Sequence, residues 1–314
     1  MELSHLKTIY FGSSEFALPI FEALLNERIK ILAVVTQPDR PTGRDLRLTP
    51  TPMKVAARSH KFDVLQFPSL SESDAVGALK VLDADLAIVA SYGQIIPKPV
   101  LSSSRLGFVN VHPSLLPKYR GPSPIQTVIL NGERTTGVTI MLLDDKMDHG
   151  PLLAQSEIAI KADDTYLSLH DRLASEGARL LVATLSLWLS EKIRPQAQDD
   201  KSATFTTLLT RETGRINWRA SAEQINRHVR AFTPWPGSWS MLDEERYKII
   251  EAAPAQSKPL PLPGQLLFLG NRLYVGCGSM TSLEIIKIQP AGRSVLTAEQ
   301  FIRGYRGQSG KIFN

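Results

Sequence analysis

Residues 8–36 read TIYFGSSEFALPIFEALLNERIKILAVVT: a β-rich run, a longer amphipathic run and a second apolar run. We predict strands at 8–11 and 31–36, with a helix over 15–26 between them. Similar segments continue along the chain. Apolar runs lie at 86–90, 107–111 and 137–142, and one long amphipathic stretch lies at 167–189. Strands that alternate with helices are typical of βαβ units. The sequence therefore predicts an α/β domain built on a mostly parallel sheet.

A different pattern follows a polar stretch in the last third of the chain. We expect a catalytic domain over 1–190, a linker over 191–206 and a second domain over 207–314. A helix is predicted near 221–231, and short strand-like segments follow at 246–251, 264–268, 272–277 and 283–289. Several short strands separated by Pro and Gly turns favour a small β-barrel, for which an OB-like fold is the expectation.

Composition narrows the class of protein. The chain has 314 residues, 43% of them hydrophobic, which is enough for a large core. Its single cysteine, Cys277, fits a reducing compartment better than a secreted scaffold. Neither a signal-like N-terminus nor a run of about 18 apolar residues is present, so we expect a cytoplasmic protein with no membrane span.

Positive charge is concentrated near the carboxyl end. Residues 1–205 hold 22 Lys and Arg against 23 Asp and Glu, whereas residues 206–314 hold 14 against 8. A basic region beside a nearly neutral one indicates a polyanionic partner, although this excess is small enough to arise by chance.

The densest chemical signal is the run 110–121, NVHPSLLPKYRG, which directly follows the apolar run 107–111. Alternate side chains of a strand face the same side, so Asn110 and His112 should lie together at the carboxyl edge of the sheet. Ligand sites of such sheets lie at that edge. A histidine with a purely structural role is the alternative.

Asp148 follows the predicted strand 137–142 within the acidic run DDKMDHGP. We predict that it meets His112 across neighbouring loops, because a carboxylate beside an imidazole favours the charged imidazolium. Asp144 and Asp145 compete for this role, and a solvated acidic turn is the simpler interpretation. His149 has no partner at metal-ligand spacing, and we predict no metal site.

The turn after the first predicted strand, Gly12-Ser-Ser-Glu-Phe-Ala17, lacks the Gly-x-Gly-x-x-Gly spacing of a dinucleotide site. The simple interpretation is a strand-to-helix turn in which Ser14 caps the helix.

A loop rich in proline and cations leaves the predicted strand 31–36. It carries Arg40, Arg44, Arg47 and Lys54 among several prolines. A compact enzyme for a small metabolite has no evident need of such an arm, and a solvated surface loop is the alternative.

Together these segments resemble the methionyl-tRNA formyltransferase family over nearly the whole chain. The matching motifs lie, in order, at 36–41, 91–97, 110–121, 147–150, 216–218, 229–236 and 289–292. Asn-x-His followed by Ser-Leu-Leu-Pro is common to folate-dependent formyltransferases, and the other motifs point to the tRNA enzyme. The chain departs from the family at its first turn, at Asp45 and at His149, where a small residue is commoner.

The resemblance implies a Rossmann-like catalytic domain and assigns residue roles. Asn110, His112 and Asp148 would be catalytic. Arg40, Arg44, Arg47 and Lys54 would contact the tRNA acceptor stem, with Arg44 the foremost. The folate pocket would be lined by Ser91, Tyr92, Gly93, Gln94, Ile95, Ile96, Pro97, Ser114, Leu115, Leu116, Pro117, Asp144 and Asp145.

The implied reaction moves the formyl group of 10-formyltetrahydrofolate to the amino group of methionine charged on initiator tRNA, for translation initiation. Asn110 and protonated His112 would stabilise the oxyanion, and Asp148 would orient His112. We expect a monomer that binds initiator methionyl-tRNA and the folate, with no metal.

Two other classes of function remain open from the sequence. One is a formyltransferase for a small amine, such as an amino sugar or glycinamide ribonucleotide, or a formyl-folate hydrolase. The other is a noncatalytic tRNA-binding protein. The second domain and the arm argue against the nucleotide enzyme, and the intact catalytic residues argue against the noncatalytic protein.

Overall fold

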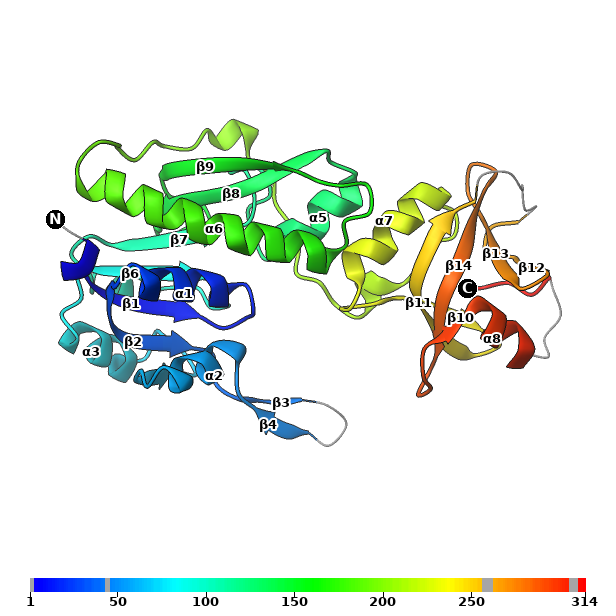
Figure 1. Ribbon diagram of the computed structural model, residues 1–314, viewed down its shortest axis with the longest axis horizontal. Coiled ribbons are helices and arrows are strands. Elements are labelled where there is room, and N and C mark those ends of the chain that lie inside the picture. Colours follow the sequence, from blue (N-terminus) through cyan, green and yellow to red (C-terminus); the bar gives the residue numbers. More distant parts are fainter. Residues whose placement is uncertain (1–2, 43–45, 256–261, 305–309) are drawn as a thin grey trace. The chain divides into compact units, whose positions relative to one another are not determined.

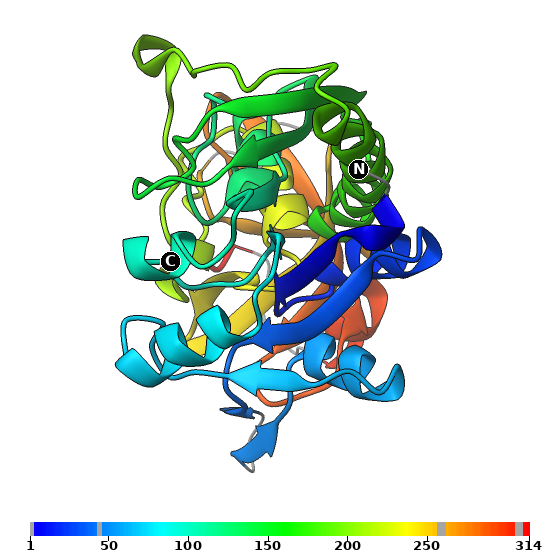
Figure 2. The ribbon, with the colours of Figure 1, turned by 90° about the vertical axis from the view of Figure 1, so that its left-hand side faces the viewer.

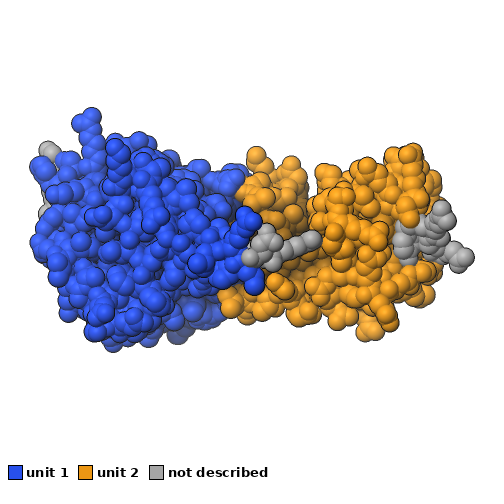
Figure 3. Space-filling view, turned by 90° about the horizontal axis from the view of Figure 1, so that it is seen from below, with its two compact units in different colours: residues 1–124, 135–159, 170–206 blue, residues 125–134, 160–169, 207–314 orange. Residues whose placement is uncertain are grey.

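The computed structural model describes residues 3–42, 46–255, 262–304 and 310–314. The chain forms two compact units (Figures 1 and 3). Unit 1 comprises residues 1–124, 135–159 and 170–206, and unit 2 comprises residues 125–134, 160–169 and 207–314. The division is therefore not a simple cut in the sequence, because two short segments from the first half belong to unit 2.

A seven-stranded sheet forms the centre of unit 1, in the order β5-β2-β1-β6-β7-β8-β9. The first five strands of this order are parallel, whereas β8 runs antiparallel to both of its neighbours. In chain order the strands are β1 (Lys7–Gly12), β2 (Lys30–Thr36), β5 (Val64–Gln66), β6 (Leu86–Ala90), β7 (Phe108–His112), β8 (Thr135–Leu142) and β9 (Leu152–Ala159). The predicted mostly parallel α/β sheet is confirmed, while β9 was not predicted.

Helices cover both faces of this sheet. They are α1 (Ala17–Asn26), α2 (Pro52–Ser59), α3 (Ser73–Val81), α4 (Lys98–Leu101) and α6 (Tyr166–Leu189), whereas most of α5 (Pro124–Asn131) belongs to unit 2. Figure 2 shows α3, in cyan, on the opposite side of the sheet from α1, in blue, and α6, in green. On the α1 and α6 side, Gly177 lets α6 approach the sheet, because a Cβ there would lie 2.8 Å from Val111.

The core on the α3 and α4 face positions the site. It includes Ile9, Phe11, Val89 and Phe108, together with residues of both helices. Phe108 begins β7 and is buried in this core. Because strand side chains alternate, Asn110 and His112 follow Phe108 on the same face.

The first turn differs from its simple interpretation. Helix α1 begins at Ala17, with Phe16 at its N-cap position and no side-chain capping bond. The hydroxyl of Ser14 instead donates to Ser91 Oγ at 2.7 Å. Ser14 therefore joins the first turn to the loop after β6.

Unit 2 contains an antiparallel sheet with its own helices, in addition to most of α5. Its elements are α7 (Ala222–Phe232), β10 (Ser238–Leu242), β11 (Glu245–Pro254), β12 (Leu266–Leu269), β13 (Arg272–Cys277), β14 (Thr281–Pro290), β15 (Leu296–Thr297) and α8 (Ala298–Gly304). The order is β10-β11-β14-β13-β12, and β15 pairs with β14. Ser221 and Gln224 form a capping box at the start of α7. The expected small β-rich region with one leading helix is confirmed, while β10 was not predicted.

Among the described residues, no helix is long and apolar enough to cross a membrane.

A half-buried histidine of α7 has a protonated form that opposes folding. His228 Nε2 faces the carbonyl oxygen of Thr213 at 3.2 Å, and Nδ1 lies 2.8 Å from Ser238 Oγ. Burial lowers the pKa of His228 from 6.5 to about 4. The unfolded chain therefore binds more protons than the folded chain between these pH values, and acid weakens the fold in this window.

We expect the free energy of unfolding of unit 2 to fall by up to roughly 3 kcal/mol as the pH drops from 6.5 to 4, with no contribution from His228 above pH 6.5. Denaturant unfolding followed by tryptophan fluorescence would measure this change, since Trp218, Trp235 and Trp239 belong to unit 2. His228→Gln should flatten the dependence, and equal pH slopes in the two proteins would count against it.

Candidate active site

Strand β7 presents Asn110 and His112 at the middle of the sheet of unit 1. Asn110 is 9% exposed and His112 4% exposed. Parallel pairing sets Val89 of β6 opposite Asn110. The loop that begins at Ser91 therefore leaves the sheet beside His112, as expected for a site at the carboxyl ends of parallel strands.

His112 is held between two oxygen acceptors. Its Nε2 lies 3.1 Å from the carbonyl oxygen of Tyr119, and its Nδ1 lies 3.6 Å from Asp148 Oδ1. The other oxygen of Asp148 accepts from the backbone N–H of Gly121 at 2.8 Å. Because both ring nitrogens face acceptors, the arrangement suits an imidazole that carries a proton on each nitrogen.

Asp148 reaches His112 by a route that the sequence did not predict. Strand β8 is antiparallel to β7, and Leu142 at its end pairs with Val109 rather than lying beyond His112. The loop after β8 must therefore turn back towards the carboxyl end of β7. Two features of this turn are the positive φ of Asp148, 47°, and Gly150, where a Cβ would overlap the carbonyl oxygen of Leu142.

The segment Ser91–Pro97 forms the loop after β6. Ser91 accepts from Ser14, and Ser13 Oγ donates to the carbonyl oxygen of Tyr92 at 2.8 Å. Burial raises the pKa of Tyr92 to about 12, and its hydroxyl has no partner among the described residues. Ile95 is 77% exposed.

Gln94 and Ile96 in the same loop have local roles. The side chain of Gln94 donates to the carbonyl oxygens of Phe67 and Pro68 and accepts from the backbone of Leu70. Ile96 is buried in the core on the α3 and α4 face. These contacts fix the loop backbone, while Ile95 is left as an exposed apolar surface.

The segment Ser114–Pro117 supports the site more than it lines it. Ser114 is fully buried, and its hydroxyl donates to the carbonyl oxygen of Lys118 at 2.7 Å. The backbone N–H of Leu116 donates to Thr139 on β8. These bonds hold the loop that carries Tyr119 against the sheet.

Asp144 and Asp145 have separate partners. Asp144 lies 2.5 Å from His149 Nδ1. Asp145 pairs with Lys98 at 2.7 Å, and Lys98 lowers the pKa of the Asp145 carboxyl. Neither residue replaces Asp148 as the partner of His112. Within the described part of the chain, no group of three or more His, Cys, Asp or Glu residues could hold a metal ion.

The predicted arm is a two-stranded hairpin of β3 (Arg40–Thr42) and β4 (Arg47–Thr49) that projects from unit 1 (Figure 1). Arg40 and Arg47 are exposed. Leu46 and Leu48, which the sequence analysis did not single out, are 70% and 71% exposed. Arg44 lies outside the described residues.

Lys54 differs from the arginines of the arm. It is 8% exposed, and its ammonium lies 2.7 Å from both Asp39 Oδ2 and Gln66 Oε1. Lys54 also lowers the pKa of Asp39. An ammonium held in this way argues against a phosphate contact for Lys54.

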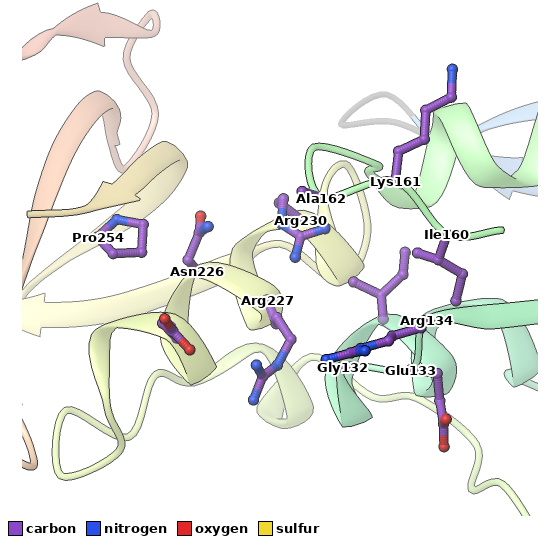
Figure 4. A pocket seen from close by; sticks show the side chains of 12 residues that line it. Gly132, Glu133, Arg134, Ile160, Lys161, Ala162, Asn226, Arg227, Arg230 and Pro254 are labelled. Atoms are coloured by element: carbon purple, nitrogen blue, oxygen red, sulfur yellow. The ribbon is translucent and has the colours of Figure 1, made fainter.

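A basic pocket in unit 2 was missed by the sequence analysis because its walls come from three distant segments. It has a volume of about 470 Å³ and is lined by Ile129, Gly132, Glu133, Arg134, Ile160, Lys161, Ala162, Glu223, Asn226, Arg227, Arg230 and Pro254. Figure 4 shows Arg227 and Arg230 projecting from α7 on the side that faces Arg134, whereas Lys161 extends away from them.

The three arginines of this pocket have no carboxylate ion pair within the described ranges. Arg227 Nε donates to the carbonyl oxygen of Leu130 at 3.2 Å, and Arg230 donates to the carbonyl oxygen of Asp164. Burial and then Arg227 lower the pKa of Arg230, which Asp164 and Asp163 partly offset. The half-buried Arg227 and Arg230 and the exposed Arg134 have no paired carboxylate, which favours an anion in the pocket, although Glu133 and Glu223 lie at its wall.

Comparisons with known proteins agree with this geometry. The Formyl transferase family matches residues 6–185, and the family described as Formyl transferase, C-terminal domain, matches residues 208–306. The methionyl-tRNA formyltransferase of Chloroflexus aurantiacus is 42% identical over 301 residues, covering 95% of this chain and 97% of that protein. That of Geobacillus thermodenitrificans is 39% identical and covers 94% and 93%.

Solved structures of similar fold include HypX from Aquifex aeolicus in complex with tetrahydrofolic acid. It is 16% identical with a TM-score of 0.66, covering 99% of this chain and 51% of that one. An N-formyltransferase from Helicobacter canadensis is 18% identical with a TM-score of 0.65, covering 89% and 98%. At these identities the likeness concerns the fold. The two family matches and the full-length relatives together place the chain in the methionyl-tRNA formyltransferase family.

Proposed function

We propose that this chain transfers the formyl group of 10-formyltetrahydrofolate to the amino group of methionine on initiator tRNA, which gives N-formylmethionyl-tRNA for translation initiation. The observation that carries the proposal is the constellation of Asn110, His112 and Asp148. Asn110 and His112 share one face of β7 near its carboxyl end, and Asp148 lies 3.6 Å from His112, in a chain of this family. A neutral amine, an oxyanion site and a proton path are what formyl transfer requires.

The residues supply the required chemistry as follows. The methionine amine attacks the formyl carbon, and the negative charge that develops on the formyl oxygen accepts hydrogen bonds from the Asn110 amide and protonated His112. The bond between that carbon and the folate nitrogen then breaks, the amine loses a proton to solvent, and the folate nitrogen takes up a proton as it leaves. Asp148 keeps His112 oriented, with Oδ1 at 3.6 Å from Nδ1.

The folate is proposed to lie along the loop Ser91–Pro97. This loop leaves the sheet beside His112, and the exposed Ile95 offers an apolar contact for a flat ring system. The unpartnered hydroxyl of Tyr92 and the fixed backbone around Gln94 support a preformed wall. Asp144 and Asp145 would border the same site from the loop after β8.

The tRNA is proposed to contact two basic surfaces. The hairpin offers the exposed Arg40 and Arg47 beside exposed leucines, and Arg44 belongs to the same arm. The pocket of unit 2 offers Arg134, Arg227 and Arg230 without paired carboxylates. Guanidinium groups on such surfaces can neutralise phosphates of the RNA backbone.

The domain organisation, the oligomeric state and the location in the cell are also proposals. We propose that residues 1–190, with the predicted linker 191–206 folded onto them, form the catalytic domain, and that 207–314 form most of a second domain of OB-like fold that binds tRNA. The five-strand antiparallel path of β10 to β14 and the basic pocket support this assignment. We also propose that the protein is a cytoplasmic monomer, in keeping with a role in translation initiation.

Transfer of labelled formyl from 10-formyltetrahydrofolate tests the function. Methionine-charged initiator tRNA, uncharged tRNA, free methionine, an amino sugar nucleotide and glycinamide ribonucleotide would be compared as acceptors. We expect product on charged tRNA alone. Transfer to a small amine, or formate release without an acceptor, would assign the same catalytic residues to a sister reaction.

A further inference from the structure

The segment 196–206, all of which was predicted to be linker, is bound to the active-site loops. Gln196 and Leu152 exchange two backbone hydrogen bonds, of 2.7 and 2.8 Å. The backbone N–H of Arg120 donates to the carbonyl oxygen of Thr204 at 2.9 Å. All of these residues belong to unit 1. This segment is therefore fixed beside the catalytic loops rather than free to act as a spacer.

Gln198 makes the most direct connection to the catalytic carboxylate. Its amide nitrogen donates to the carbonyl oxygens of Asp148, at 2.9 Å, and Gly150, at 2.8 Å. Its amide oxygen accepts from Nε and Nη2 of Arg120, at 3.1 and 2.8 Å. Both N–H groups and the oxygen of the amide are thus engaged, and the side chain joins the Asp148 loop to the loop that follows β7.

Arg120 is fixed in turn by an acidic residue of the same segment. Arg120 is 3% exposed and pairs with Asp200 at 2.8 Å. The other oxygen of Asp200 lies 3.2 Å from His149 Nε2, and His149 also contacts Asp144. Arg120, and to a smaller extent His149, lower the pKa of Asp200, so that its carboxylate stays ionised. These contacts fix the Arg120 guanidinium, which donates to the amide oxygen of Gln198.

The backbone of Asp148 needs such an anchor. Its φ of 47° lies in the left-handed region, which costs energy for a residue with a side chain. Its carboxylate is set by the N–H of Gly121, and its peptide group by Gln198. Without Gln198, the carbonyl oxygens of Asp148 and Gly150 lose the donors that hold this turn towards His112.

We propose that Gln198 is a positioning residue for formyl transfer, which holds Asp148 in its left-handed conformation against His112 by bridging the Asp148 loop to Arg120. The inference rests on the proposed function, and it connects the segment 196–206 to the catalytic loop through Gln198. Gln198 acts through Asp148 and has no direct role in the reaction.

Turnover of the full chain provides the first test. Gln198→Leu keeps the approximate shape of the side chain and removes all four hydrogen bonds. We expect kcat to fall by about tenfold to 10²-fold with little change in either KM, because a small displacement of a catalytic group lowers the rate without weakening ground-state binding. Ser202→Ala is the matched control, since this exposed residue of the same segment bonds only to Asp199. An unchanged kcat in Gln198→Leu would overturn the proposal.

A double-mutant cycle separates positioning from a general loss of structure. In the Asp148→Asn background, Gln198→Leu should cause a much smaller further loss of kcat than in the native background. The same fold loss in both backgrounds would overturn the proposal, because Gln198 would then act independently of Asp148.

Amide hydrogen exchange tests the same geometry without turnover, and so separates this inference from the proposed function. The N–H of Gly121 is held by Asp148 Oδ2. We expect faster exchange at Gly121 in Gln198→Leu, with the amides of β7 unchanged. Unchanged protection of Gly121 would overturn the proposal, whatever acceptor the enzyme uses.

Discussion

Replacement of His112 or Asn110 by alanine is expected to lower kcat for formyl transfer by ~10²–10³, since each removes one donor to the developing oxyanion. Both side chains are buried on the same face of β7, and His112 is positioned by Asp148 and by the carbonyl oxygen of Tyr119. Donors fixed in advance stabilise the transition state without reorganising, which is why the loss should appear in kcat rather than in KM. Single-turnover transfer to charged initiator tRNA would measure it.

His60→Ala is a suitable control for this experiment. His60 is half exposed and pairs with Glu22 on the surface of unit 1. His60→Ala makes the same substitution as His112→Ala at a position outside β7, and we expect near-native turnover. Unfolding temperatures of all variants should be compared, so that a lost fold is not mistaken for lost chemistry. Near-native kcat in a folded His112→Ala protein would contradict the assigned role.

Affinity for charged tRNA is expected to fall steeply with salt. About six phosphate contacts from the hairpin and the unit 2 pocket would lower the association constant by roughly 10³ between 50 and 200 mM salt. Arg134→Gln combined with Arg227→Gln should reduce the slope of log affinity against log salt by roughly 1.4–1.8, since each lost contact removes about 0.7–0.9. Filter binding over a salt series would measure both slopes.

The matched control is Arg303→Gln in unit 2. Arg303 is an exposed cation that pairs with Glu299 on α8 and does not line the pocket. The Arg303→Gln variant should have a slope of log affinity against log salt close to that of the native protein. A pocket double variant with the native slope would exclude phosphate binding by the pocket, while kcat at saturating tRNA would still report on the formyl transfer chemistry.

Several local features followed from the sequence because they depend on residues close together in the chain. The two-residue period of β7 predicted that Asn110 and His112 share a face, and both are buried there. The helical pattern near 221–231 predicted α7, whose capping box begins at Ser221. Arg272–Cys277 was predicted as a strand and is β13.

Other features depended on how distant segments come together. The sequence predicted the meeting of Asp148 and His112 but not its route, because nothing local indicates that β8 runs antiparallel. Lys54 looked like a free cation of the arm, yet Asp39 and Gln66 bind its ammonium.

By itself, the sequence determined the alternation of strands and helices, the face that carries Asn110 and His112, and the family. Periodicity and motif order are properties of neighbouring residues, so they can be found in a linear chain. Only the tertiary structure decided that Gln198 bonds to the Asp148 loop, 48 to 50 positions away, and that arginines from separate segments share a pocket. Such contacts depend on strand direction and on the packing of distant loops, which hydrophobic periodicity does not encode.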